Sequence, residues 1–197
     1  MDQSAYPFLI RYNMACDLTK GRILPCREAV GGIKEVYFVD YGDLGTITLT
    51  ADEVTDMSGT FSAYQYKLKG NSSMTQNVTA SRDNGTVFYE QTLELTLPRL
   101  SKEDNKELKL LAYGRPHIVV VDYNGNAFLM GREHGADVTG GTVVSGAAMG
   151  DMSGYTLSFT ANELQPANFI DSPAVDNPFN GMASATEQIV VGTDSWA

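Results

Sequence analysis

The sequence predicts a mainly β protein, an antiparallel β-sandwich or barrel with one flanking α-helix and a long β-hairpin. Short runs of β-branched and aromatic residues recur along the chain, and Asn-Gly pairs at 84–85 and 124–125 mark tight hairpin turns. Only one stretch carries helix signals at both of its ends. With 197 residues and a hydrophobic fraction of 43%, the chain can bury the core of one domain.

Extended segments dominate the first half. Residues 33–41 (IKEVYFVDY) and 46–50 (TITLT) have strand composition, and residues 61–69 alternate between apolar and polar side chains. Residues 72–81 are polar on both faces. The turn at 83–85 then leads into residues 86–97, where every second residue from 93 on is leucine. We therefore expect residues 61–99 to form a long hairpin arm.

The second half begins with the predicted helix. Ser101 is suited to the N-cap and Asp104 to its capping-box partner, while Gly114 ends the helix. We expect its inner face to consist of Leu108, Leu111 and Ala112. Two strands follow at 116–123 and 126–130. The first has an apolar run on both faces, which predicts a central position in a sheet.

Two more strands are predicted around residues 143–144 and 155–160, joined by a glycine-rich link. Beyond residue 168 the apolar pattern fades into Pro, Asp, Asn and Ser. We expect one domain over residues 1–170 and an extended or flexible C-terminal arm over residues 171–197.

Charge is distributed unevenly. The chain has 14 basic and 24 acidic residues, a net charge of −10. Residues 35–60 and 133–197 contain carboxylates but no Lys or Arg. Such segments produce a negative surface, which repels the phosphates of nucleic acids.

Motifs for catalysis, cofactors or metals are weak. His117 and His134 lie outside metal-ligand spacings, and the glycines at 140–141, 146, 150 and 154 form neither a dinucleotide nor a phosphate loop. Turns or close subunit packing explain those glycines better. Asp122, Asn124 and Asn126 resemble a calcium loop that lacks its final glutamate. We predict no catalytic residue, no cofactor and no metal.

Cellular context is indicated by other features. Cys16 and Cys26 suit a reducing compartment, although a bond between them stays open. We expect neither a signal peptide nor a membrane span. The single tryptophan, Trp196, argues against stacking on sugars, although ten tyrosines leave a carbohydrate-binding module as a remote alternative.

Two long stretches, 16–48 (CDLTKGRILPCREAVGGIKEVYFVDYGDLGTIT) and 111–170 (LAYGRPHIVVVDYNGNAFLMGREHGADVTGGTVVSGAAMGDMSGYTLSFTANELQPANFI), resemble structural proteins of tailed bacteriophages. The chain is most similar to the major tail tube proteins of phages with Bacteroidetes-type hosts. The resemblance implies a β barrel or sandwich with a helix, hexameric rings that stack into a tube, and a lumen for the genome. It further implies no enzyme activity, assembly in the host cytoplasm, location in the virion, and tape measure, terminator or sheath proteins as partners.

A DNA conduit should not bind DNA, so base-free segments suit its lining. The candidate lumen acids are Asp43, Glu53, Asp56, Asp137 and Asp151. For each of these acids, a position on an outer face, where the charge only keeps the protein soluble, is an equally good interpretation.

The tip of the predicted hairpin has almost nothing to bury. We expect it to become ordered against a neighbouring subunit or ring, and a plain exposed loop is the alternative. The candidate contact residues are Met74, Gln76, Val78, Arg82, Asn84 and Gly85.

Other virion roles stay open, namely a tail terminator, a head–tail joining ring or a capsid decoration protein. Ring symmetry, the contractile or non-contractile nature of the tail, the host and the acidic segment that faces a lumen are also open.

Overall fold

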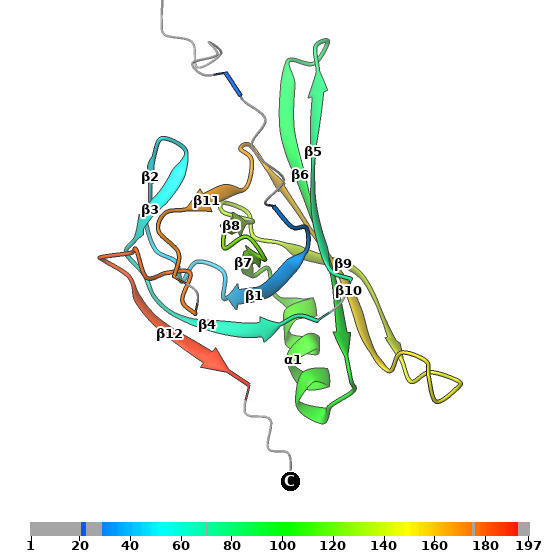
Figure 1. Ribbon diagram of the computed structural model, residues 1–197. Helices are drawn as coiled ribbons and strands as arrows, with labels where there is room; N and C mark the ends of the chain where they lie inside the picture. The colour runs from blue at the N-terminus through cyan, green and yellow to red at the C-terminus, as the bar shows by residue number, and fades with distance from the viewer. Residues whose placement is uncertain (1–20, 23–28, 70, 175, 193–197) are drawn as a thin grey trace, which may run out of the picture.

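The computed structural model describes residues 21–22, 29–69, 71–174 and 176–192. In these residues, strands form two sheets and a single helix flanks them (Figure 1). The predicted mainly β fold with one flanking helix is confirmed. Sheet A has eight strands in the order β12-β4-β1-β7-β8-β11-β3-β2, and sheet B has four in the order β5-β6-β10-β9.

The strands of sheet A are β1 (Ile33–Val39), β2 (Ile47–Thr50), β3 (Glu53–Met57), β4 (Thr60–Lys67), β7 (His117–Asp122), β8 (Ala127–Met130), β11 (Asn168–Ile170) and β12 (Thr186–Val191). Those of sheet B are β5 (Ser73–Ser81), β6 (Thr86–Pro98), β9 (Asp137–Val144) and β10 (Gly154–Glu163). Neighbouring strands are antiparallel except for β12 beside β4 and β11 beside β3.

Strands β1 and β7 form the centre of sheet A. They pair with each other, β1 also pairs with β4, and β7 also pairs with β8. Residues from His117 to Val121 are all buried. A strand that is apolar on both faces needs cover on both faces, which explains the central position predicted for it.

Sheet A is curved around its own core. One apolar cluster contains side chains from β4, near one edge of the sheet, and from β3, near the other edge. Ile189 on β12 and Ile47 on β2, the two edge strands, pack against this same cluster. The sheet is therefore rolled in the manner of a barrel.

A second cluster joins the two sheets. It unites Val36 and Phe38 of β1 with Leu93 and Leu95 of β6 and with Phe159 of β10. Phe38 and Phe159 meet with their ring centroids 5.3 Å apart. The opposite faces of sheet A thus line two cores, so barrel and sandwich features occur in one domain.

The helix α1 (Lys102–Tyr113) begins as predicted, because the Ser101 side chain accepts a hydrogen bond from the Asp104 amide at 3.0 Å. Leu108 is buried and Leu111 packs against the cluster between the sheets. Ala112 is exposed, so its predicted place on the inner face is wrong.

The predicted arm over residues 61–99 is wrong in its pairing. Residues 60–67 form β4 and pair with β1 and β12 in sheet A, while the hairpin consists of β5 and β6 alone. Phe61 and Ala63 bury their side chains in the core of sheet A, which explains why this strand belongs there. The Asn84-Gly85 turn is where the sequence predicts it, with Gly85 at φ 63°.

The described part of the C-terminal segment, residues 171–174 and 176–192, also differs from the prediction of an extended or flexible arm beyond a domain at 1–170. Phe179 and Met182 are buried in the core of sheet A, and Phe179 packs edge-on against Tyr37 and Phe61. Strand β12 then pairs with β4. Burial of two large apolar side chains secures the segment to the body.

Cys16, Cys26, Trp196 and the first twenty residues lie outside the described part of the chain. Among the described residues, no helix has the length and apolar character to cross a membrane.

Candidate functional site

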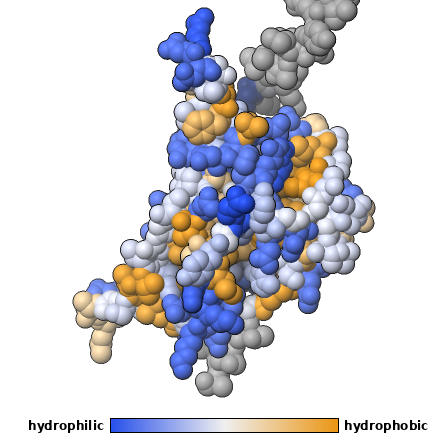
Figure 2. Space-filling view, turned by 180° about the vertical axis from the view of Figure 1, so that it is seen from behind, coloured by the Kyte–Doolittle hydropathy of each residue, from blue (hydrophilic) through white to orange (hydrophobic). Residues whose placement is uncertain are grey.

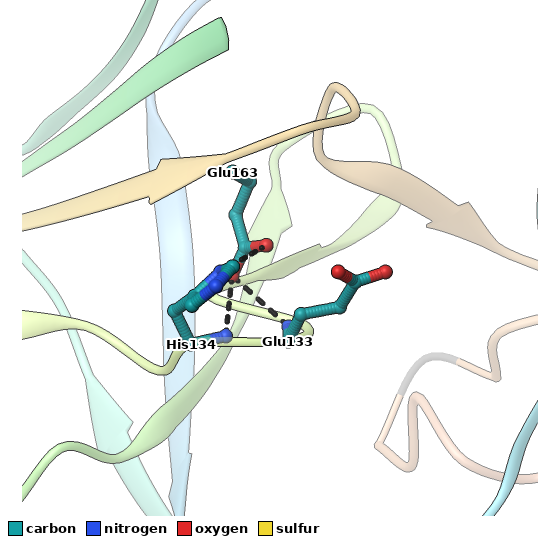
Figure 3. Close-up of side chains that lie close together, drawn as sticks. All are labelled: Glu133, His134 and Glu163. Carbon is teal, nitrogen blue, oxygen red and sulfur yellow. Dashed lines mark hydrogen bonds and ion pairs between the residues drawn. The ribbon is translucent and has the colours of Figure 1, made fainter.

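A buried carboxylate organises the loop that follows β8. Glu163, at the end of β10, is only 4% exposed. Its Oε1 accepts hydrogen bonds from the backbone amides of Glu133 at 3.0 Å and His134 at 2.9 Å. Its Oε2 lies 3.2 Å from Nδ1 of His134 (Figure 3). A side chain of sheet B thus holds a loop of sheet A.

Three further side chains bind the same loop, residues 131–135. Gln91 of β6 accepts a hydrogen bond from the Gly131 amide at 3.1 Å. Tyr41 donates from its hydroxyl to the Glu133 carbonyl at 2.8 Å. His117 lies with Nδ1 2.6 Å from the Gly131 carbonyl. The loop is therefore bound by both sheets.

The tautomer of His117 follows from its partners. The Gly42 amide can only donate, so Nε2, at 3.2 Å from it, accepts and Nδ1 carries the proton that binds the Gly131 carbonyl. Burial lowers the pKa of His117, although the Gly131 carbonyl and the charges of Glu163 and Asp43 act in the opposite direction. The neutral ring is therefore the form that fits this fold.

Glu133, His134 and Glu163 form a group that sequence reasoning missed. One candidate ligand atom from each residue lies within 4.8 Å of the others. However, both oxygens of Glu163 already accept hydrogen bonds, and Glu133 is paired with Arg132. Figure 3 shows the Glu133 carboxylate directed away from the other two side chains. The group fits a loop-fixing role better than a metal centre.

The calcium-like turn is also internally satisfied. The Asp122 carboxylate accepts hydrogen bonds from the backbone amides and the side-chain amides of Asn124 and Asn126. Partial burial acts to raise the pKa of Asp122, but these hydrogen bonds outweigh it and the pKa lies below its usual range. The ionised carboxylate therefore shapes a turn.

The predicted lumen acids are divided between the two sheets. Asp43 lies in the turn after β1, Glu53 begins β3 and Asp137 begins β9, and all three are exposed. Asp56 accepts hydrogen bonds from the Ser184 hydroxyl and amide, which lower its pKa and tie residue 184 to β3. The amides of Ala148 and Ala147 bind Asp151 and lower its pKa in the same way. The last two acids therefore have structural roles of their own.

The candidate hairpin residues fall into two groups, those that contact the rest of the fold and those that are exposed toward the turn. Met74 packs against the core between the sheets, and the Gln76 side chain accepts a hydrogen bond from the Ala167 amide at 2.8 Å. Val78 is 61% exposed, and Arg82, Asn84 and Gly85 are exposed at the turn. Met74 and Gln76 thus belong to the body of the fold.

The outer part of the hairpin, residues 77–88, exposes apolar side chains. Val87 and Phe88 are adjacent on β6, so they point to opposite faces, and both are exposed with Val78. Figure 2 shows a narrow projection with a hydrophilic tip and apolar surface below it. We call residues 77–88 the β5–β6 arm.

The other end of sheet B projects in a similar way, and of the predicted site residues it contains Asp151 alone. Residues 142–155, here the β9–β10 arm, carry Val143 at 63% exposure and the exposed side chains of Val144, Met149 and Met152. Gly146 adopts φ 74° in its loop, and a Cβ at Gly141 would lie 2.8 Å from the Thr156 carbonyl oxygen. These glycines therefore serve a turn and close packing within the fold.

Comparison of the chain with protein-family models, curated proteins and solved structures finds no match.

Replacement of Glu163 by Ala should lower the free energy of unfolding by about 2–4 kcal/mol, because two amide donors and His134 lose a charged acceptor. Urea denaturation measures this loss. Glu94→Ala, an exposed position on β6, is the matched control and should change the value by less than about 0.5 kcal/mol. Equal midpoints for the two variants would contradict the role of Glu163.

His117 should make the fold sensitive to mild acid. Its pKa is lowered in the folded state, so the unfolded chain binds more protons below about pH 6.5 and stability decreases as the pH falls. The loss is at most about 1.4 kcal/mol per pH unit. The free energy of unfolding is measured for wild type and for His117→Gln between pH 7 and 5. The difference between the two proteins isolates the contribution of His117, because the other titrating groups are the same in both. Parallel curves for the two proteins would show that His117 does not contribute.

Proposed function

We propose that this chain is the structural subunit of a bacteriophage tail tube, which self-assembles into stacked, hexameric rings around a channel for DNA. The observation that carries the proposal is the pair of arms at the two ends of sheet B. Each arm exposes apolar side chains that the subunit itself leaves uncovered.

A two-stranded ribbon is only marginally stable in water without a partner surface. The β5–β6 arm has such a ribbon with Val78, Val87 and Phe88 exposed. The opposite arm adds Val143 and Val144. Contacts between neighbouring copies would bury both arms, and arms at opposite ends of one sheet favour head-to-tail association.

Ring closure or stacking follows from such contacts. When two different surfaces meet, the copies form a ring if the rotation closes and a filament if it does not. Strands β5 and β9 are the edges of sheet B, and their unpaired backbone N–H and C=O groups could hydrogen-bond to a strand of a neighbouring copy. A tube needs both kinds of contact, within a ring and between rings.

The charge of the chain supports a conduit for DNA. A net charge of −10 disfavours binding to phosphates, and Asp43, Glu53 and Asp137 are exposed acids to which the fold assigns no structural role in the contacts described above. These three are the better candidates for a lumen surface. A tail terminator or joining ring, or a decoration protein, would use similar arms without growing into tubes.

Negative-stain electron microscopy of the purified full chain at high concentration tests the proposal. Tubes with a central channel are the expected result. Single rings would favour a terminator or joining role. Monomers at every concentration, also after addition of tail-tip proteins, would contradict self-assembly.

Charged residues on both arms should abolish assembly without unfolding the subunit. We expect the double variant Val78→Asp, Val143→Asp to stay folded and monomeric, because both positions are exposed in the subunit but would be buried between copies. Light scattering and circular dichroism measure the two properties. Leu110→Asp, on an exposed position of α1, should assemble normally. Normal tubes from the double variant would exclude the arms as contacts.

Lysines at the candidate lumen positions should make tubes retain DNA. With Asp43→Lys, Glu53→Lys and Asp137→Lys combined, tubes assembled with duplex DNA should protect it from nuclease at low salt and release it at high salt. A control with the same charge change, Glu94→Lys, Glu103→Lys and Glu107→Lys, alters exposed residues of β6 and of the helix that lie outside both arms. Equal nuclease digestion with both variants would place the three acids outside the channel.

A further inference from the structure

A groove lies between the β5 edge of sheet B and strand β11 of sheet A, lined by residues 72–76 and 166–169. Its volume is about 670 Å³, which is within the range of binding pockets in proteins. Phe128 and Phe169 also line it, with their ring centroids 4.5 Å apart, and Phe169 is 46% exposed. The groove therefore has an aromatic wall that is partly open to solvent.

The rim of the groove carries carboxylates. Asp52 and Asp122 line it, and Asp52 is exposed. Asp52 belongs to the tight turn between β2 and β3, and the Asn168 side chain donates to the Asp52 carbonyl at 2.9 Å, which holds this turn at the rim. A matching surface should therefore be apolar and have positive charge beside it.

The tip of the β9–β10 arm is a closed loop that displays one large apolar side chain. The Asp151 carboxylate accepts hydrogen bonds from the backbone amides of Ala147 at 2.9 Å and Ala148 at 2.7 Å, so its charge is directed into the loop. Met149, inside this turn, is fully exposed. Because the loop is closed by its own hydrogen bonds, binding would cost little conformational entropy. Methionine also makes favourable contacts with aromatic rings.

Basic side chains flank the base of this arm. Residues 99–115 contain five basic and three acidic residues. Arg99 and Lys102 are exposed, and the Arg99 amide donates to the Ser153 carbonyl at the foot of the arm. The four residues from Ser153 to Met149 span at most about 14 Å, so positive charge lies near the tip. An apolar tip with positive charge beside it matches the aromatic groove and its acidic rim.

The arm is too far away to fill the groove of its own chain. It precedes β10, whereas the groove wall at residues 166–169 follows β10, so the whole strand separates the two. Ten residues at about 3.3 Å each make this separation about 30 Å. Pairing with β6 along its full length keeps β10 extended, and Figure 1 shows the two hairpins of sheet B projecting from opposite ends. A second copy of the chain is therefore the occupant that fits.

We propose that the β9–β10 arm of one copy inserts Met149 into the groove of a second copy, against Phe128 and Phe169. Lys102 beside the arm then faces Asp52 on the rim of the second copy. The contact joins two different surfaces, so it is head-to-tail and repeats from copy to copy. This inference rests on the proposed function, because it names one pair of surfaces for the contacts between copies.

Photo-crosslinking of the full-length protein tests this contact. A benzophenone amino acid replaces Met149, the protein is mixed with isotope-labelled wild type, and the concentrated sample is irradiated. Mass spectrometry identifies the linked peptides, and the label separates links between copies from links within one chain. We expect links between copies to residues 72–76 or 166–169. The matched control carries the same group at Val191, an exposed position on the edge strand β12, and should give no links to the groove.

Two variants of the groove, introduced into the labelled copy, complete the test. Phe169→Ser removes part of the aromatic wall at a partly exposed position and should lower the yield of these links at least about fivefold. Asp52→Asn removes one charge from the rim, and Asn tolerates the left-handed backbone at this position, where φ is 66°. It should lower the yield about twofold. Circular dichroism verifies that both variants are folded.

The outcomes separate this inference from the proposed function. Tubes with links outside the groove, or with a yield that neither variant changes, would overturn this inference alone. Links to the groove in oligomers that never grow into tubes would support it and contradict the tube. Monomers without links between copies would overturn both.

Discussion

The polar connection between the two sheets at residues 131–135 is the constraint on which the rest of the structure depends. The apolar cluster between the sheets buries large side chains such as Phe38, Leu93 and Phe159, but the hydrophobic effect is not directional. Glu163 and Gln91 reach from sheet B to backbone groups of one loop, and His117 binds that loop from sheet A. These contacts define how the sheets are placed relative to each other. Among the described residues, every buried side-chain nitrogen or oxygen has a hydrogen-bond partner, so the buried polar groups add specificity without an unsatisfied group.

Features encoded over a few residues were predictable from the sequence. The Ser101 cap, the Asn84-Gly85 turn and the central strand β7 each depend on neighbours in the chain, and the structure has all three. Pairing over long distances was not predictable. Strand β4 looks like one half of a hairpin with β6, yet its partners are β1 and β12, and Phe179 is a lone aromatic residue in a polar stretch whose burial depends on the curvature of sheet A. The partners of Glu163 are backbone amides, which leave no signature in the sequence. Of the candidate site, the hairpin was foreseen, and the glycine-rich stretch was predicted to serve turns or close subunit packing, but the exposed apolar side chains of the β9–β10 arm were not predicted.

In the proposed assembly, folding and contacts between copies depend on different parts of sheet B. The middle of sheet B, around Leu93, Leu95 and Phe159, packs against sheet A, whereas the two ends of sheet B extend beyond sheet A. Side chains at the ends, such as Val78 and Val143, contribute little to the stability of a single subunit because they are exposed in it. The same side chains are free to contribute to contacts between copies. One sheet therefore forms half of a core and, in the proposed assembly, two docking surfaces.

In the proposed assembly, this separation would also limit uncontrolled aggregation of a subunit with exposed apolar arms. A net charge of −10 opposes close approach of copies in any orientation that brings the acidic segments together. Head-to-tail contact between different arms needs a defined geometry, so only a few orientations bury the apolar side chains and keep the carboxylates apart. Strand β5 is the point where these requirements meet. Its outer half lies in an arm, while Met74 in its inner half packs against the core between the sheets. The inner half of β5 is therefore part of the core, whereas its outer half remains available for the proposed contacts between copies.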